Sequence, residues 1–300
     1  MFGREKLIQK VEKTLKERKF NVCRYENLCL DLAAKQESCL LLLKILFNID
    51  SIQKDQALGL RVLSSILNAR SYIVGKITRT EFLKDGIVYE RFEIPAVTPK
   101  TLEMILDEKY PILRRDRGGL FVTIDPIKLR NARKKKRLSR AKLARLVGTT
   151  KKNIYDHERR EFRASIELVH RLENILGETI RKISIQTDSN LPEIYPKNRM
   201  EERAVRLFRK IGFWATTLRK APPDVAIKGH FLAFVGIVET EKEIKKRIET
   251  LKNFSEFVDE PAFVVVPDKV DHELDVPVVN LKLLENEAER PEDLKKIIFS

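Results

Sequence analysis

The spacing of apolar and polar residues divides the first part of the chain into helices and strands. Glu5–Lys19 places Leu7, Val11 and Leu15 on one side at helical spacing and predicts an amphipathic helix. The run 38–47 is nearly continuous in apolar residues, which is typical of a strand buried on both faces. The same patterns predict strands at 20–25, 28–34 and 71–74 and a helix at 53–68. This order indicates an α/β or α+β domain.

The pattern is less regular in the stretch that follows. Asp85-Gly86 stands between apolar residues and predicts the turn of a β-hairpin. Thr98–Asp107 predicts a helix with Pro99 in its first turn. Arg117-Gly118-Gly119 predicts a tight turn into a strand.

The last third of the chain shows similar patterns. Pro192 and Pro196 lie among polar residues and indicate a linker. The predicted helices after it are 201–211, 241–254 and 291–298, and the predicted strands are 213–218, 224–227, 231–238, 262–266 and 276–280. This order indicates a second small α/β domain.

Between these regions the apolar period is helical. Ser139 predicts the N-cap of one helix and Gly148 its end. Thr150 predicts the cap of the next helix, Lys151–Glu158, and Ala144 is small where the two helices must approach closely. Helix, glycine turn and capped helix predict a helix-turn-helix. Helical spacing also predicts helices at 127–133, 165–176 and 178–183.

Charge sets this helical segment apart. Residues 126–183 hold eighteen Lys and Arg against six Asp and Glu, a balance of +12 in a chain that carries +15. Such a concentration favours a phosphate-binding surface, because released counterions drive association with nucleic acid. Taken alone, Lys134–Arg137 is explained by a solvated helix face, but its place beside a helix-turn-helix pattern favours DNA binding.

The helical segment resembles the DNA-binding domain of the Cro/repressor (XRE-type) family. The matching residues are Leu129, Arg133, Leu138-Ser139, Leu143-Ala144, Gly148, Thr150, Ile154 and Glu158. The resemblance implies that Arg133 pairs with Glu158 and ties the first helix to the third. The chain departs from the family pattern at Arg140, His157 and Arg159-Arg160. With this domain in mid-chain, the arrangement also resembles the helix-turn-helix regulators of archaea.

The same resemblance implies that the helix 151–158 lies in the major groove of duplex DNA. Lys151 and Lys152 would then point at base edges and donate to guanine O6 and N7. Asp156 has two interpretations of equal weight. It accepts from cytosine N4, or it pairs with Lys152 one turn away.

Other residues of the segment are expected to position the domain. Arg140, Thr150 and Asn153 would hold phosphates and set register. Tyr155 and His157 are expected to be packed or partly exposed structural side chains. Since one such domain reads few base pairs, a homodimer on a palindromic site is expected.

Length and composition agree with a multidomain chain. Its 300 residues exceed one comfortable core, and no apolar run reaches membrane-spanning length. Three cysteines without CxxC spacing predict a reduced, cytoplasmic protein with no metal site, and no cofactor is expected. The predicted fold is a central all-α helix-turn-helix bundle of about five helices flanked by two small α/β domains. The predicted boundaries are 1–125, 126–186, a linker at 187–198, and 199–300.

The two flanking regions share one order of elements. Each has a helix, a strand, an aspartate that opens a second strand, a buried strand, a long helix and one more strand. Asp31 holds this place in the first region and Asp224 in the second. The sequence therefore predicts an internal duplication.

This order also resembles the restriction-endonuclease-like fold, whose PD-(D/E)xK signature holds a divalent metal between two carboxylates. Asp31 and Lys44 match two parts of the signature. Leu42 and Phe234 replace its second carboxylate in the two regions, and Gly236 replaces the second lysine. One carboxylate is a poor ligand set for a hard cation, so any cleavage chemistry is expected to be lost. Any small α/β domain would explain these elements equally well.

Three functions follow from these patterns. The leading hypothesis is a sequence-specific DNA-binding transcriptional regulator, not an enzyme, whose flanks supply dimerisation, effector sensing or backbone contacts. The alternative from the enzyme class is a metal-dependent nuclease guided by the helix-turn-helix, which the missing acid beside Lys44 disfavours. The third is an architectural or antitoxin-like binding protein, for which a stoichiometric protein partner would be the evidence.

Overall fold

The structure is a computed structural model of the 300-residue chain. It describes residues 2–37, 39–107, 113–116, 119–181, 194–238, 241–267, 275–287 and 290–299. The chain divides into two compact units. Unit 1 comprises Met1–Thr14, Leu46–Ser51 and Tyr72–Thr187, and unit 2 comprises Leu15–Ile45, Ile52–Ser71 and Asp188–Ser300. The predicted turn at Arg117-Gly118 and most of the predicted linker, 187–193, lie outside the described residues.

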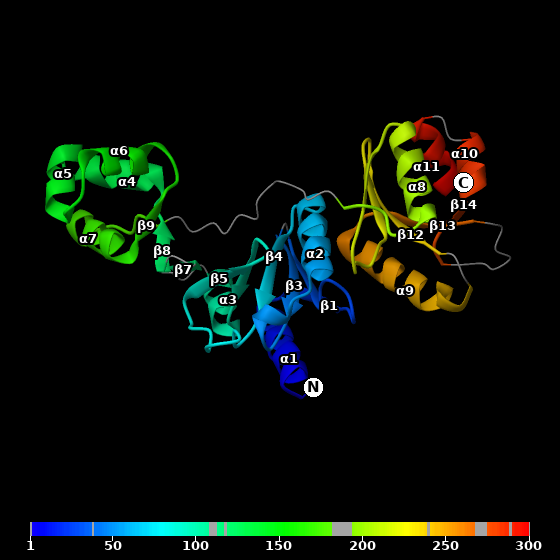
Figure 1. Ribbon diagram of the computed structural model, residues 1–300, viewed down its shortest axis with the longest axis horizontal. Helices are drawn as coiled ribbons and strands as arrows, with labels where there is room; N and C mark the ends of the chain where they lie inside the picture. The colour runs from blue at the N-terminus through cyan, green and yellow to red at the C-terminus, as the bar shows by residue number, and fades with distance from the viewer. Residues whose placement is uncertain are drawn as a thin grey trace. The chain divides into compact units, whose positions relative to one another are not determined.

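The chain begins with α1 (Phe2–Glu17), and the first strands of unit 2 follow it (Figure 1). The strands β1 (Asn21–Arg24), β2 (Leu32–Gln36) and β3 (Cys39–Ile45) pair in this order and are antiparallel. Leu41, Leu42 and Leu43 of β3 are at most 1% exposed, as the continuous apolar run predicts. The helix α2 (Lys54–Ile66) follows along the chain.

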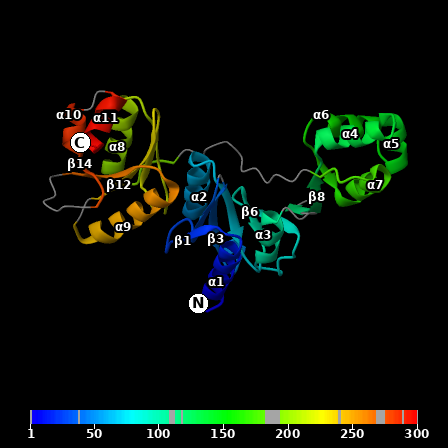
Figure 2. The same ribbon diagram turned by 180° about the vertical axis from the view of Figure 1, so that it is seen from behind.

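The C-terminal part of unit 2 is a five-stranded sheet in the order β10-β11-β12-β13-β14. Its strands are β10 (Trp214–Thr217), β11 (Val225–Lys228), β12 (Leu232–Ile237), β13 (Ala262–Val266) and β14 (Val278–Asn280). Its helices are α8 (Arg199–Lys210), α9 (Glu241–Val258), α10 (Leu281–Glu287) and α11 (Pro291–Phe299). The first three strands are antiparallel, and β12 and β13 are parallel because α9 crosses over between them. Figures 1 and 2 show α8 and α9 on opposite faces of this sheet.

Unit 1 holds strands that pair in the order β4-β6-β5-β7-β8-β9. These are β4 (Arg70–Val74), β5 (Ile87–Arg91), β6 (Ile94–Val97), β7 (Leu113–Asp116), β8 (Gly119–Thr123) and β9 (Arg163–Ser165). The short η1 (Ile49–Ser51) and α3 (Pro99–Leu106) also belong to this unit. The predicted hairpin turn at Asp85-Gly86 is wrong, because this turn only leads into β5. The hairpin turns instead at Phe92 and Glu93, whose positive φ values of 51° and 63° suit a tight connection.

Four helices follow β8 in unit 1. They are α4 (Pro126–Lys135), α5 (Arg140–Val147), α6 (Lys151–Arg159) and α7 (Ile166–Leu176). Their buried apolar residues form one core that includes Leu129, Leu143, Ile154 and Leu172. We call α4–α7 with β8 and β9 the central domain.

The prediction of a central all-α bundle between two α/β domains is wrong. The chain is mixed α/β throughout, and the central domain contains β8 and β9, which pair antiparallel with Val122 opposite Ala164. The predicted fifth helix is also absent from the described residues 178–181. There Arg181 forms a bridge with Ile124 and an ion pair with Glu173. The three-residue β9 is too short to show a period of its own.

Two other expectations concern membranes and cysteines. Among the described residues, every helix falls short of the length or hydropathy that crossing a membrane requires. Cys23, Cys29 and Cys39 are free thiols. The predicted domain boundaries stay predictions.

Candidate nucleic-acid interface

Local capping builds the helix-turn-helix of the central domain. The Ser139 hydroxyl accepts from the amide of Lys142 at 3.1 Å and begins α5. Gly148 ends α5 with a φ of 69°, a conformation that glycine adopts without a steric penalty. Two residues later the Thr150 hydroxyl accepts from the amide of Asn153 at 3.1 Å and begins α6. The turn between the helices is therefore encoded residue by residue.

A buried ion pair ties α4 to α6. Arg133 donates through Nε and Nη2 to the two oxygens of Glu158, with 3.1 Å between Nη2 and Oε2. Arg133 also donates to the carbonyl of Leu138, and Arg140 donates to Glu158 at 2.7 Å. Burial raises the pKa of Glu158, but the hydrogen bonds and charges of the two arginines outweigh burial and hold it below its usual value. This is the pairing that the Cro/repressor resemblance implies.

The predicted base-reading residues lie at the start of α6. Lys151 and Lys152 are exposed and form no ion pair within the described residues. Asp156 is half-buried, and no ion pair joins it to Lys152 among the described residues, but its pairing with Lys152 stays a prediction. Its contact with a base stays a prediction.

The predicted phosphate-binding residues also make contacts within the central domain. Arg140 donates through Nε to Glu158, and its guanidinium lies 5.3 Å from the centre of the Tyr155 ring. Its outer nitrogens have no partner among the described residues. Thr150 serves as the cap of α6. Asn153 is half-buried, and its Oδ1 has no hydrogen-bond partner among the described residues. Their contacts with phosphate stay predictions.

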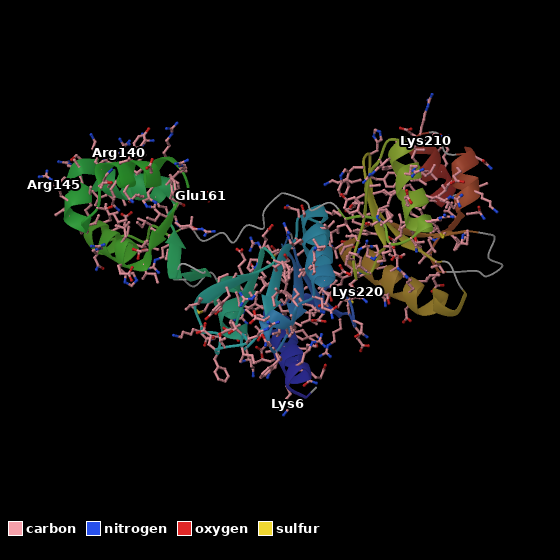
Figure 3. All side chains as sticks on the ribbon, in the orientation of Figure 1. Lys6, Arg140, Arg145, Glu161, Lys210 and Lys220 are labelled. Atoms are coloured by element: carbon pink, nitrogen blue, oxygen red, sulfur yellow. The ribbon has the colours of Figure 1, made fainter. Side chains whose placement is uncertain are left out.

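Unpaired positive charge covers several elements of the central domain. Exposed basic side chains without an ion pair among the described residues are Lys128, Arg130, Lys134, Lys136, Arg137, Lys142, Arg145, Lys151 and Lys152. Figure 3 shows Arg140 and Arg145 on this domain. An excess of cations without carboxylate partners favours contact with the phosphates of nucleic acid.

Two exposed aromatic side chains, one in α6 and one just after it, contact arginines. Tyr155 is 42% exposed beneath Arg140, and its hydroxyl lies 3.5 Å from Arg159. Phe162 is 37% exposed, and the Arg160 guanidinium stacks 4.4 Å from its ring centre. The sequence signal for such contacts is an aromatic residue close to arginines in α6 or just after it.

His157 lies on the inner side of α6 and is 3% exposed. Its ring meets Phe162 edge to face, and its Nδ1 has no hydrogen-bond partner among the described residues. Burial lowers the pKa of His157, and the neighbouring Asp156 carboxylate opposes this shift only in part. The folded domain therefore holds a neutral imidazole at neutral pH.

We expect the central domain to lose stability as the pH falls below about 6.5. In that range the unfolded chain binds a proton at His157 and the folded domain does not, at a cost of at most about 1.4 kcal/mol per pH unit. Amide exchange in α6 between about pH 5 and 7 measures the effect. His157→Leu should remove most of it. An unchanged pH dependence in that variant would assign the effect to another group.

A second candidate site lies between β2 and β3 in unit 2. The Asp31 carboxylate accepts from Lys44 Nζ at 3.1 Å and from the Ile45 amide at 2.7 Å. Lys44 also donates to the carbonyl of Leu28 at 2.7 Å, and both side chains of the pair are at most 2% exposed. Leu42 is fully buried where the signature has its second acid. Both side chains of the pair are therefore buried and hydrogen-bonded. No group of three metal-binding side chains occurs among the described residues.

The second aspartate has the same surroundings. Asp224 Oδ2 accepts from the amide of Ile237 at 2.9 Å, as Asp31 accepts from Ile45. The backbone amides of both aspartates donate across to the neighbouring strand. This shared hydrogen-bond pattern supports the predicted internal duplication.

One part of the chain matches a known family model, and nearly the whole chain is similar to known archaeal proteins. Residues 4–111 match the model of a PD-(D/E)XK superfamily domain, in agreement with the resemblance noted for the first flanking region. Over nearly its whole length the chain is similar to archaeal proteins named "Putative HTH-type transcriptional regulatory protein". The relative from Pyrococcus furiosus is 31% identical over 98% of this chain and 97% of its own length.

The chain belongs to this archaeal family of helix-turn-helix-type transcriptional regulatory proteins. Another member, from Methanocaldococcus jannaschii, is 29% identical over 99% of this chain and 98% of its own length. A third, from Methanothermobacter thermautotrophicus, is 35% identical over 84% of this chain and 79% of its own length. No solved structure matches the chain. The archaeal resemblance is thus confirmed, and the family model points to a PD-(D/E)XK domain rather than to a Cro-type one.

Proposed function

We propose that the protein is a sequence-specific DNA-binding transcriptional regulator that reads duplex DNA through a Cro/repressor-type helix-turn-helix. The observation that carries the proposal is the start of α6, where Lys151 and Lys152 are exposed and unpaired among the described residues. The ion pair between Arg133 and Glu158 fixes α6 against α4, so its first turn is presented on a rigid support. Exposed cations on α4 and α5 supply the phosphate contacts that set register.

The proposal includes a homodimer. A single helix-turn-helix reads one half-site, and two copies related by a two-fold axis read a palindrome with half-sites about one helical turn apart. Selection of bound fragments from random DNA tests the proposal. We expect an enriched palindromic motif. Retention of DNA without any enriched motif would contradict specific readout.

A metal-dependent nuclease is the second candidate, because residues 4–111 match a PD-(D/E)XK superfamily domain. We propose that this domain does not cut DNA. Lys44 and the Ile45 amide occupy the Asp31 carboxylate, and Leu42 supplies no second ligand for a cation. A hard divalent cation requires several oxygen ligands at once.

Supercoiled plasmid incubated with the protein and magnesium or manganese should therefore stay intact. Any background nicking should occur at the same rate with the unmutated protein and with Asp31→Asn. Nicking by the unmutated protein that Asp31→Asn abolishes would revive the nuclease assignment. The signature Lys44 offers a second check, because Lys44→Gln should abolish any true metal-dependent cleavage as well.

A further inference from the structure

Five charged side chains, Asp224 among them, form a cluster in unit 2. Lys197 Nζ lies 3.5 Å from Glu201 Oε1 and 3.9 Å from Asp224 Oδ1. Arg219 Nη1 lies 3.5 Å from Glu201 Oε2, and Arg247 from α9 pairs with Asp224. The side chains come from α8, α9, the start of β11 and the segments beside them. Three cations thus meet two carboxylates, and the cluster carries one net positive charge.

The corresponding place in the first repeat is arranged differently. There Lys44 lies opposite Asp31 on the next strand and closes the site. In the second repeat Gly236 takes the place of the lysine, and a Cβ atom there would lie 3.0 Å from Leu251 Cδ2. Leu251 of α9 thus packs against Gly236, and a side chain at this position would require Leu251 to shift. Arg247 neutralises Asp224 from α9 instead.

Exposure separates the two signs of charge in the cluster. The side chains of Asp224 and Glu201 are 3% exposed, whereas those of Lys197 and Arg247 are 46% and 37% exposed. Arg219 is 14% exposed, and its guanidinium pairs with Glu201 through Nη1 and donates to the carbonyl of Tyr195 through Nη2. A molecule in solution therefore meets Lys197 and Arg247 before it meets the two carboxylates.

The cations also crowd one another. Burial lowers the pKa of Lys197, and the nearby charges of Arg219 and Arg247 lower it further, against the opposing charge of Glu201. Burial likewise lowers the pKa of Arg247. An anion placed among these three groups would relieve their repulsion.

We propose that Lys197 and Arg247 bind a phosphate group directly, with the positive charge of Arg219 behind them and without a metal ion. Guanidinium forks match phosphate oxygens in pairs, and an ammonium adds a point charge. The phosphate comes either from a DNA backbone or from a small phosphorylated ligand. This site lies outside the central domain and goes beyond the proposed readout by α6.

Salt dependence of binding by the full-length protein tests the first source. The variant Lys197→Gln leaves Asp224 paired with Arg247, and Lys210→Gln removes the same charge at the other end of α8. With random-sequence duplex DNA, Lys197→Gln should reduce the slope of log K against log salt by about 0.9 for one lost phosphate. Lys210→Gln should leave it unchanged. Fluorescence of Trp214, the chain's one tryptophan, checks that this domain is folded.

Inorganic phosphate tests the second source without any DNA. At equal ionic strength, millimolar phosphate in place of chloride should raise the melting temperature of the unmutated protein and of Lys210→Gln, but not that of Lys197→Gln. A phosphate effect with unchanged DNA slopes would assign the site to a small ligand. If folded Lys197→Gln matches Lys210→Gln in both experiments, the proposal is overturned, whatever the outcome for α6.

Discussion

Replacing Arg133 by alanine should destabilise the central domain by about 3–5 kcal/mol, the usual cost of removing one partner of a buried ion pair. The Glu158 side chain is 2% exposed and would keep only Arg140, whose own side chain is 34% exposed. The change also leaves the carbonyl of Leu138 without its guanidinium donor. Because this pair holds α6 against α4, the recognition helix should lose its support.

Amide hydrogen exchange in α6 measures this loss, since Trp214 lies in another part of the chain and does not report on it. Arg130→Ala is the matched control, an exposed arginine on α4 with no ion pair among the described residues. Replacing Arg133 and Glu158 together by leucine should recover part of the protection, because no buried carboxylate is then left underpaired. Equal exchange in Arg133→Ala and Arg130→Ala would show that the pair does not hold α6.

The parts of this molecule that could be predicted from sequence are those set by local chemistry. Ser139, Gly148 and Thr150 begin or end helices through contacts within three residues of themselves, so a short window contains the whole cause. The long apolar run of β3 likewise carries its own signal. These elements position the candidate interface, which is why its location could be read before the structure was known.

The parts that could not be predicted depend on distant partners. β9 has three residues, and only its pairing with β8, about forty positions earlier in the chain, makes it a strand. The same holds for Arg247, which reaches Asp224 from 23 positions away. No periodicity records such a contact. Pairing of this kind turned an expected all-α domain into a mixed one and hid the charged cluster of unit 2.

The aspartates of the two flanking regions are neutralised in different ways. Residues 4–111 match a PD-(D/E)XK domain. There Asp31 forms a buried ion pair with Lys44, and buried Leu42 stands where the signature has its second acid. In the second repeat, exposed cations surround the equivalent aspartate. Neither arrangement gathers three metal-binding side chains among the described residues, and the second is the one for which we propose phosphate binding.

Replacing Lys151 and Lys152 together by alanine should abolish the preference for the selected DNA site while leaving salt-sensitive binding to random DNA. Each good contact with a base edge contributes about 1–3 kcal/mol of discrimination, so the loss of two should lower the ratio of specific to random binding by at least about 30-fold. The remaining exposed cations of the central domain still meet phosphates. Fluorescence anisotropy with labelled duplexes at two salt concentrations measures both affinities.

If the lysines acted through their charge alone, their loss would weaken binding to specific and random DNA equally. A matched variant distinguishes this possibility from base reading. Lys134→Ala with Lys136→Ala removes the same charge from exposed, unpaired lysines at the end of α4 rather than at the start of α6. This control should weaken binding to specific and random DNA by the same factor, because phosphate contacts carry no sequence information. Should both double variants keep the same specificity ratio as the unmutated protein, α6 does not read bases.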